Sequence, residues 1–357
     1  FGASDIYGGI NGFWDYGPLG TELKNNLRDL WWKRMVTCPP IGPDGHPVQM
    51  VGLDSAIIQN PKVWVASGHV GGFSDPMVDC KETKKRYRAD HLKLFGFSDK
   101  PNVYAAVLPD LEPEELKKNL KKIGLLASYE NDKSYEEDFV KLVGNDSSVL
   151  KFIYGPDAKE IGTLTEPKAF NLLFETKIGA VAKDDDIAYL RGETAQGIFI
   201  NYKNVLDSSR VKVPFGIAQI GKAFRNEVNP RNFIFRSREF EQMEMEFFCH
   251  PDEAKMWFDF WKEERKKFWQ ALGLSAENLL MREHGQDELV FYSKGTFDIE
   301  YKFPFTAPGF GELEGIAYRT NYDLTQHQEH SGQKMEYIDP DDPKNRYIPH
   351  VIEPAAG

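Results

Sequence analysis

Residues 224–248 bring together side chains that could bind a phosphate, a flat ring and an amine. They read FRNE, then a loop, then FRSREFEQMEMEFF. In a strand, alternate side chains share a face. One face would hold Phe240, Gln242, Glu244 and Glu246, and the other Glu241, Met243, Met245 and Phe247. Because Gln242, Glu244 and Glu246 make one face unusually polar for a half-exposed strand, the pattern predicts a concave polar floor. Before this strand, Arg225 suits a phosphate and Glu227 an exocyclic amine.

The elements around this stretch must position those side chains. The apolar spacing of residues 18–35, with a proline at the start, predicts an amphipathic helix, and residues 252–272 predict a second. Strand-like content covers residues 189–199, 215–225, 239–248, 297–303 and 311–317. Residues 98–165 are charged and helix-forming. We therefore expect helices and strands in one domain built from residues 1–97 and 166–357, with a helical insertion at 98–165.

The composition is that of an ordinary globular protein, with 41% hydrophobic residues, 28% charged residues and a formal net charge of −11. No apolar run of about 18 residues is present, which predicts no membrane span. Cys38, Cys80 and Cys249 lack metal-site spacing, so we expect no structural zinc and a reducing, cytoplasmic compartment. The acidic charge argues against DNA as a partner, whereas basic clusters at 84–88 and 117–122 leave contact with RNA open.

The 224–248 stretch resembles motif 2 of the class II aminoacyl-tRNA synthetases, two antiparallel strands joined by a loop. The resemblance implies an α+β fold in which an antiparallel β-sheet is flanked by helices. The resemblance implies that Arg225 is catalytic and holds the α-phosphate of ATP, that Glu227 meets the adenine amino group, and that Phe240 stacks on the adenine. Arg236 and Arg238 would contact the triphosphate or the acceptor end of tRNA. The implied ATP-binding residues are Arg225, Asn226, Glu227, Phe235, Arg236, Ser237, Arg238, Glu239, Phe240, Glu312, Leu313 and Gly357. A surface hairpin held by salt bridges is the structural alternative, but it explains the whole run poorly.

Four further stretches resemble the glycyl-tRNA synthetases within that class. Residues 6–20 and the helix after them resemble motif 1, which implies a homodimer. The other three are residues 63–91 with Arg88, residues 190–197 with Glu193, and residues 310–317 with the run on to 348–354. The implied glycine-binding residues are Arg88, Glu193, Phe240, Glu241, Gln242, Met243, Glu244, Glu353, Pro354, Ala355, Ala356 and Gly357.

Glycine offers no side chain, so a site must recognise its ammonium and its carboxylate with opposite charges. The candidates for the ammonium are Glu193, Glu353 and one of Glu241 or Glu244, and the candidate for the carboxylate is Arg88. Rejection of alanine and serine must then be steric.

The reaction that the resemblance implies is formation of glycyl-adenylate from glycine and ATP, followed by transfer of glycine to tRNA(Gly). It needs no protein nucleophile, because positioning and charge stabilisation supply most of the catalysis. Glu312 is the candidate ligand for Mg²⁺ bound with ATP. The alternatives are an enzyme of the same fold for serine, threonine or proline, and a non-catalytic tRNA-binding paralogue.

The sequence departs from the family pattern at its C-terminal end. Ala355 stands where many family members have serine, which removes one hydroxyl contact to glycine. The chain starts at Phe1 and stops at Gly357, before the arginine of motif 3 and the C-terminal anticodon-binding domain that the resemblance implies. We therefore expect it to be a catalytic-domain fragment.

Overall fold

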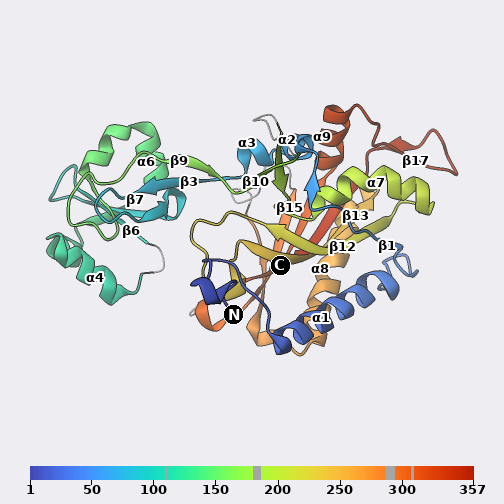
Figure 1. The fold of residues 1–357 in the computed structure, drawn as a ribbon, viewed down its shortest axis with the longest axis horizontal. Helices are drawn as coiled ribbons and strands as arrows, with labels where there is room; N and C mark the ends of the chain where they lie inside the picture. Colours follow the sequence, from blue (N-terminus) through green and yellow to red (C-terminus); the bar gives the residue numbers. More distant parts are fainter. Residues whose placement is uncertain (109–110, 180–185, 286–293, 307–308) are drawn as a thin grey trace. The chain divides into compact units, whose positions relative to one another are not determined.

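The computed structural model describes residues 1–108, 111–179, 186–285, 294–306 and 309–357. The chain forms two compact units, one made of Phe1–Val70 with Leu173–Gly357 and the other of Gly71–Leu172. Both units contain helices and strands (Figure 1). Among the described residues, no helix combines the length and the hydropathy that a membrane span requires.

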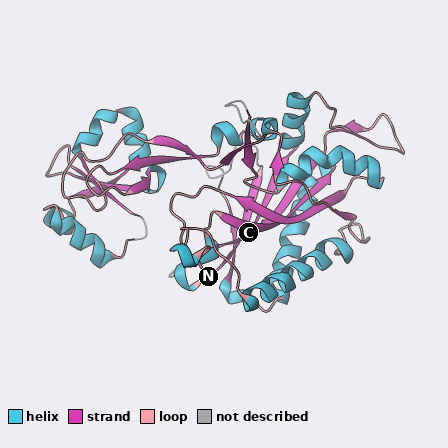
Figure 2. Cartoon of the chain, in the orientation of Figure 1, coloured by secondary structure: helices cyan, strands magenta, loops and turns pink. Residues whose placement is uncertain are grey.

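A seven-stranded sheet forms the centre of the first unit (Figure 2). Its strand order is β1 (Met50–Gly52), β12 (Phe215–Phe224), β13 (Glu239–Cys249), β19 (His350–Ala356), β16 (Gly311–Thr320), β15 (Gly295–Tyr301) and β14 (Leu279–Glu283). β1 pairs with β12 in parallel, and the other neighbours pair antiparallel. The register places Glu244 opposite both Gln219 and Ala355. The predicted antiparallel sheet is confirmed.

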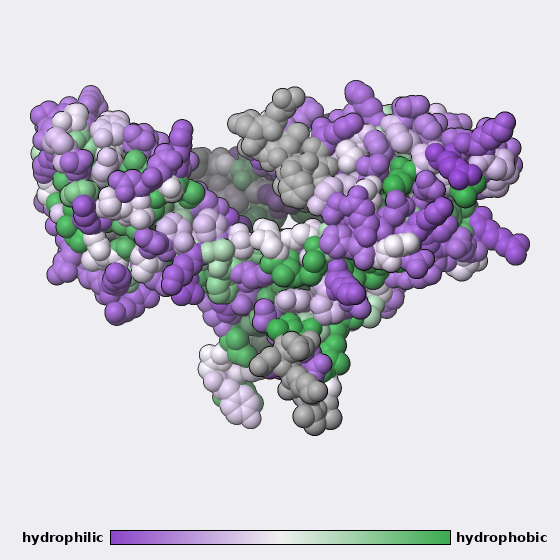
Figure 3. Space-filling view, turned by 90° about the horizontal axis from the view of Figure 1, so that it is seen from above, coloured by the Kyte–Doolittle hydropathy of each residue, from purple (hydrophilic) through white to green (hydrophobic). Residues whose placement is uncertain are grey.

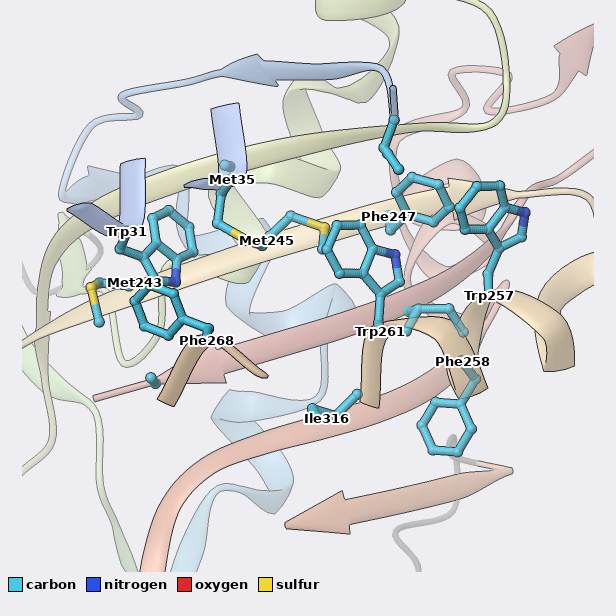
Figure 4. Close-up of a cluster of buried hydrophobic side chains, with 14 of the residues drawn as sticks. Trp31, Met35, Met243, Met245, Phe247, Trp257, Phe258, Trp261, Phe268 and Ile316 are labelled. Atoms are coloured by element: carbon cyan, nitrogen blue, oxygen red, sulfur yellow. The ribbon is translucent and has the colours of Figure 1, made fainter. Parts of the chain in front are cut away.

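One face of this sheet is covered by α1 (Pro18–Trp32), the π-helical turn η2 (Lys33–Thr37) and α8 (Ala254–Ala271). Figure 4 shows the resulting cluster, with Trp31, Met35, Met243, Met245, Phe247, Trp257, Phe258, Trp261, Phe268 and Ile316. The apolar residues of β13 alternate with its polar ones, as the two-residue period of a strand requires. Both predicted amphipathic helices are therefore confirmed, and they fix the polar face of β13 to the opposite side of the sheet.

That opposite side carries α7 (Ala195–Ser209) and α9 (Tyr322–Ser331). The prediction of a strand over 189–199 is wrong beyond Leu190, because β11 (Ile187–Leu190) ends there and α7 begins at Ala195. Ala195, Ile198, Phe199 and Tyr202 are all buried, and this spacing of three, four and seven residues is the helical period. The first turn of α7 is thereby brought against the polar floor.

The remaining elements of the first unit are short. They are η1 (Asp5–Tyr7), β2 (Ile58–Gln59), α2 (Pro61–Ala66), β10 (Phe174–Lys177), η5 (Phe233–Phe235), η6 (Pro251–Glu253), η7 (Ala276–Asn278), η8 (Pro304–Thr306), β17 (Tyr337–Ile338) and β18 (Arg346–Tyr347). β10, β11 and β2 form a small sheet, and β17 pairs with β18. Helix α3 (His69–Gly72) lies where the chain passes from the first unit to the second.

The second unit contains two sheets as well as helices. One sheet consists of β4 (Arg86–Arg88), β3 (Ser74–Asp79) and β9 (Lys168–Asn171), and the other of β7 (Ser134–Asp138), β5 (Lys93–Phe97), β6 (Tyr104–Val107) and β8 (Ile153–Tyr154). The helical elements are η3 (Ala89–His91), α4 (Pro113–Lys122), α5 (Leu126–Glu130), α6 (Phe139–Asn145) and η4 (Ser147–Phe152).

This unit differs in two ways from the helical insertion expected at 98–165. It begins before residue 98, because β3 and β4 pair with each other and β3 pairs with β9. It also carries strands where charge density suggested helix. Strand β7 reads SYEED and four of its five residues are exposed, but its main chain pairs with β5. Charged side chains are common on such an edge strand, so charge density alone did not distinguish a strand from a helix.

Candidate active site

Buried polar side chains form a floor on the face of β12, β13 and β19 that the large hydrophobic cluster leaves free. They are Gln219, Gln242, Glu244, Glu246 and Glu353. Gln219 and Glu246 are fully buried, and Glu244 is 3% exposed. One carboxylate oxygen from each of the three glutamates lies within 4.8 Å of the others. Buried acids this close together repel one another, so the arrangement is suited to receiving a cation.

The chain before α7 is tied to this floor through Thr194. Its backbone N–H donates to Gln242 Oε1 at 3.1 Å, and its hydroxyl donates to Glu244. Gln219 Nε2 donates to the Thr194 carbonyl at 3.2 Å. Arg191, which is 2% exposed, donates from Nε to the Lys222 carbonyl at 2.6 Å. These hydrogen bonds fix the position of residues 191–194 relative to β12 and β13.

Glu193 lies between those anchors and is held ionised. His69 Nε2 lies 3.3 Å from Glu193 Oε2, and Gln196 Nε2 donates to Glu193 Oε1 at 2.9 Å. Burial by itself raises the pKa of Glu193, but the charge and hydrogen bond of His69, with the charge of Arg319, outweigh it and hold this pKa well below its ordinary range. The carboxylate is therefore negative throughout the physiological pH range.

Arg319 organises the acids on the other side of the floor. It donates from Nε and Nη2 to the two oxygens of Asp323, each at 2.8 Å, and from Nη1 to Glu353 Oε2 at 2.8 Å. Gln196 Nε2 reaches Asp323 Oδ1 at 3.1 Å. A bidentate guanidinium–carboxylate pair of this kind fixes geometry as well as charge, so Glu353 and Glu193 are held by one connected network.

The floor carries more acids than cations, and this imbalance changes its protonation. Burial, followed by repulsion from Glu353 and Glu193, raises the pKa of Glu244 to about 8. Burial also raises the pKa of Glu353, against the attraction of Arg319. A positively charged ligand group entering between Glu193, Glu244 and Glu353 would relieve this repulsion.

Arg225 and Phe240 lie next to the floor at the end of β12 and the start of β13. The Arg225 guanidinium is 5.5 Å from the centre of the Phe240 ring, and Arg225 Nε donates to the Gly192 carbonyl at 2.9 Å. A Cβ added to Gly357 would lie 3.9 Å from the Phe240 ring. Phe240, Gln242 and Glu244 share one face of β13, and four residues of strand span about 13 Å. The aromatic ring of Phe240 and the acid Glu244 thus follow one another along β13, with the Arg225 guanidinium beside the ring from the end of the neighbouring strand β12.

The loop between these strands is held by Arg238. Its Nε donates to the Glu227 carbonyl at 2.8 Å, its Nη1 donates to the Asn11 carbonyl at 2.8 Å, and its backbone N–H donates to the Gly12 carbonyl. The segment that resembles motif 1 therefore contacts the segment that resembles motif 2.

Several predicted nucleotide contacts have structural partners of their own. Phe235 packs against Phe303 and Phe305, and Ser237 donates to the Glu239 carbonyl. Lys222 pairs with the Glu239 carboxylate, and Arg236 pairs through its backbone with Arg231. The side chain of Leu313 packs on the hydrophobic cluster of Figure 4. Asn226 and Glu227 are half-buried in the same loop. Their roles at a nucleotide stay predictions.

Glu312 and Asp298 face a common space above Gly315. A Cβ added to Gly315 would lie 3.5 Å from Glu312 Oε1 and 3.7 Å from Asp298 Oδ1. His284 Nε2 is 2.6 Å from Asp298 Oδ2. Desolvation, followed by repulsion from Asp298, raises the pKa of Glu312, while Arg225 lowers it. Two carboxylates with an arginine nearby fit a Mg²⁺ ion that also binds phosphate oxygens.

Four predicted glycine contacts have side chains on the wrong face of the sheet. Glu241 pairs with Lys24 at 3.1 Å and Arg28 at 3.8 Å, both from α1. Met243 and Ala356 belong to the hydrophobic cluster, and Pro354 lies opposite Ile316 of that cluster. Strand alternation therefore excludes these four side chains from the polar floor. Of the two candidates Glu241 and Glu244, only Glu244 lies on the floor.

Arg88 belongs to the second unit. There its Nη1 lies 3.0 Å from Asp75 Oδ1 and its Nη2 2.6 Å from Asp90 Oδ2. Both acids lie within the same unit. Its contact with a glycine carboxylate stays a prediction.

Sequence reasoning missed five residues of the network, namely His69, Gln196, Gln219, Arg319 and Asp323. One signal was available for the last pair, because an arginine and an aspartate four residues apart across a strand-to-helix junction can pair locally. A second signal was available for Gln219, whose amide side chain stands in the otherwise apolar run FGIAQI. His69 gave no such signal, since its partner is distant in the sequence.

Comparisons with known proteins indicate the family of this chain. The family described as tRNA synthetase class II core domain (G, H, P, S and T) matches residues 174–336. A glycine–tRNA ligase of Rhodopirellula baltica is 47% identical over 100% of the chain and 72% of its own length. Glycine–tRNA ligases of Treponema denticola and Clostridium acetobutylicum are 46% and 48% identical over the whole chain, which covers 64% and 68% of their lengths.

Proposed function

Because this chain belongs to the glycine–tRNA ligase family of class II synthetases, we propose that it joins glycine to ATP as glycyl-adenylate and passes the glycine to tRNA(Gly). The observation that carries the proposal is the order of groups along β13 and its neighbours. Phe240 and Arg225 occupy one end, and the acids Glu193, Glu244 and Glu353 occupy the other. This order matches an adenylate, which has an aromatic base at one end and an ammonium at the other.

The acidic end is suited to an amino acid without a side chain. Glu193, Glu244 and Glu353 supply negative charge for an ammonium group. The hydrogen bond from Arg319 Nη1 holds the Glu353 carboxylate in position. Ala355 lies in register with Glu244 on one side and Gly315 on the other. The buried floor would reject a larger amino acid by steric contact, because a filled pocket penalises each added methylene by about 1–3 kcal/mol.

The reactive end stabilises charge and has no need of a nucleophile. Arg225 would bind the α-phosphate as the glycine carboxylate attacks it, and Phe240 would hold the base. Glu312 and Asp298 would hold Mg²⁺, which neutralises phosphate charge when bound. Asn226, Glu227 and Arg238 would shape the loop around the nucleotide. Location in the cytoplasm stays a prediction.

Glycine binding should be coupled to release of a proton from Glu244. Burial and repulsion from Glu353 and Glu193 raise the pKa of this carboxyl to about 8, so below that pH it is mostly neutral, and an ammonium favours its ionised form. The KM for glycine should therefore fall as pH rises towards about 8, by at most about tenfold per pH unit for one proton, and level off above it. Pyrophosphate exchange at a series of glycine concentrations and pH values measures this. In Glu244→Gln the KM for glycine should no longer fall with rising pH. A KM for glycine that does not change with pH in the unaltered enzyme would contradict the coupling.

We also propose that α1 and the segment before it form a homodimer contact. Leu19 and Leu23 of α1 are 88% and 72% exposed, and Ile6 and Tyr7 are exposed as well. Figure 3, which views the chain from above, shows many hydrophilic residues on the surface, with hydrophobic ones among them. Exposed apolar residues that cluster in one segment mark an interface more often than scattered ones do.

Charged residues at these positions should break such a dimer. The double variant Leu19→Glu/Leu23→Glu is expected to sediment as a monomer at concentrations where the unaltered protein is a dimer, because burying two carboxylates in an apolar contact is costly. Ile338→Glu, an exposed apolar position in β17, is the matched control and should stay dimeric. A monomeric unaltered protein would reject the proposal.

The decisive test of the function is pyrophosphate exchange by the full-length protein with each standard amino acid in turn. Exchange with glycine alone is expected. Exchange with serine, threonine or proline instead of glycine would keep the class and overturn the specificity. No exchange with any amino acid, in a folded protein that still binds tRNA, would favour a non-catalytic tRNA-binding paralogue.

A further inference from the structure

Glu246 is the deepest acid of the polar floor. It is 0% exposed, and neither of its carboxyl oxygens has a hydrogen-bond donor among the residues that the structure describes. It points to the same face of β13 as Glu244 and lies opposite Ile217. An ionised carboxylate in such a place would cost several kcal/mol, because nothing replaces the water that it lost.

The groups around Glu246 are mostly acids. Oxygens of Glu244, Glu246 and Glu353 lie within 4.8 Å of one another. The cation whose charge acts on Glu246 is Arg319, which donates to Asp323 and Glu353. Among the described residues, the charged groups around the floor also include Glu193 and His69, which pair with each other, and Arg191, whose charge interacts with Glu244. Two carboxylates can share a hydrogen bond only if one of them carries a proton, and the Glu246 and Glu353 carboxyls contact each other.

We propose that Glu246 is a positioning residue that carries a proton and donates its O–H to the Glu353 carboxylate. Glu353 is then held from two sides, by the Arg319 guanidinium and by the Glu246 hydroxyl, with its charge directed to the ligand ammonium. The inference rests on the proposed function, because it takes the ligand ammonium to be that of glycine. Burial, followed by repulsion from Glu353, raises the pKa of Glu246 well above its ordinary range, which agrees with the geometry.

Paired substitutions test whether glycine binding needs a hydrogen-bond donor or a negative charge at position 246. Glu246→Gln keeps the shape and an N–H donor, so the KM for glycine should stay within about threefold of the unaltered enzyme. Glu246→Leu removes the donor, and because a hydrogen bond to a charged group contributes about 1.5–3 kcal/mol, KM should rise roughly 10- to 150-fold with a smaller change in kcat. Glu353→Gln, which removes the charge itself, is the positive control for a raised KM. If Glu246→Gln raised KM as much as Glu246→Leu, the negative charge of Glu246 would be the active feature and the proposal would fall.

A second measurement does not depend on catalysis or on the folding of the leucine variant. The infrared spectrum of the full-length protein near neutral pH should contain the C=O stretch of a protonated carboxylic acid, and this band should lose intensity in Glu246→Gln. An identical band in both proteins would overturn the proposal. So would a divalent metal that co-purifies in stoichiometric amount and is lost in Glu246→Gln, because the three glutamates would then form a metal site. Failure of the proposed function, seen as exchange with another amino acid, leaves the infrared result unaffected.

Discussion

Replacing Arg225 with alanine in the full-length enzyme is expected to slow glycyl-adenylate formation by about 100- to 1,000-fold. Removal of one preorganised donor to a developing negative charge typically has an effect of this size. The guanidinium lies over Phe240 and donates to the Gly192 carbonyl, so its loss would also loosen the chain next to Glu193. Glycine-dependent pyrophosphate exchange at saturating substrates measures the effect on kcat.

The control for this variant is Lys222→Ala. Lys222 is an exposed cation on the same strand, paired with Glu239, and its loss should change the exchange rate by no more than a few-fold. Circular dichroism and thermal unfolding establish that both variants fold. An Arg225→Ala enzyme that exchanges pyrophosphate within a few-fold of normal would remove Arg225 from the phosphate site.

Glu193→Gln is expected to raise the KM for glycine by roughly 30- to 5,000-fold, because loss of one partner of a desolvated charge pair costs about 2–5 kcal/mol. The amide keeps the shape of the side chain, so the network through Gln196 and Asp323 remains. The charge that should attract the ammonium is lost, and His69 is left beside a neutral group. The KM for ATP should change little, because Phe240 and Arg225 are untouched.

The matched control is Glu263→Gln, the same substitution at an exposed position of α8, which should leave both KM values within about twofold, as expected for a surface substitution. Pyrophosphate exchange at varied glycine, with ATP fixed, gives the measurement. If KM for glycine were unchanged in Glu193→Gln while KM for ATP rose, the acidic end would belong to the nucleotide and the order of groups proposed along β13 would be reversed.

Local patterns of the chain were sufficient to predict the parts that depend on periodicity. The alternation of β13 follows from its own letters, and so does the helix at 254–271, because each has one apolar face. The antiparallel sheet, in contrast, was expected from the resemblance to the class II synthetases. The helix at Ala195 was misread, because its first five residues, 195–199, are all buried and so short a run without an exposed face does not reveal the helical period.

The site was only partly predictable, for a related reason. Motif spacing indicated Arg225, Glu193 and Glu353, and it left both Glu241 and Glu244 as candidates. The strand period already put these two on opposite faces, but only the pairing of Glu241 with α1 showed that its face is the one covered by helices. The partners His69, Arg319 and Asp323 come from three different elements, so no local window contains the network.

By itself, the sequence determined which side chains are acidic, aromatic or cationic and how they alternate along each strand, because these properties depend on neighbours in the chain. Only the tertiary structure decided how those side chains meet. It brings Glu244, Glu246 and Glu353 close together and buries them away from water. Burial among like charges raises the pKa of a glutamate, and this is why the protonation of these three side chains depends on the fold.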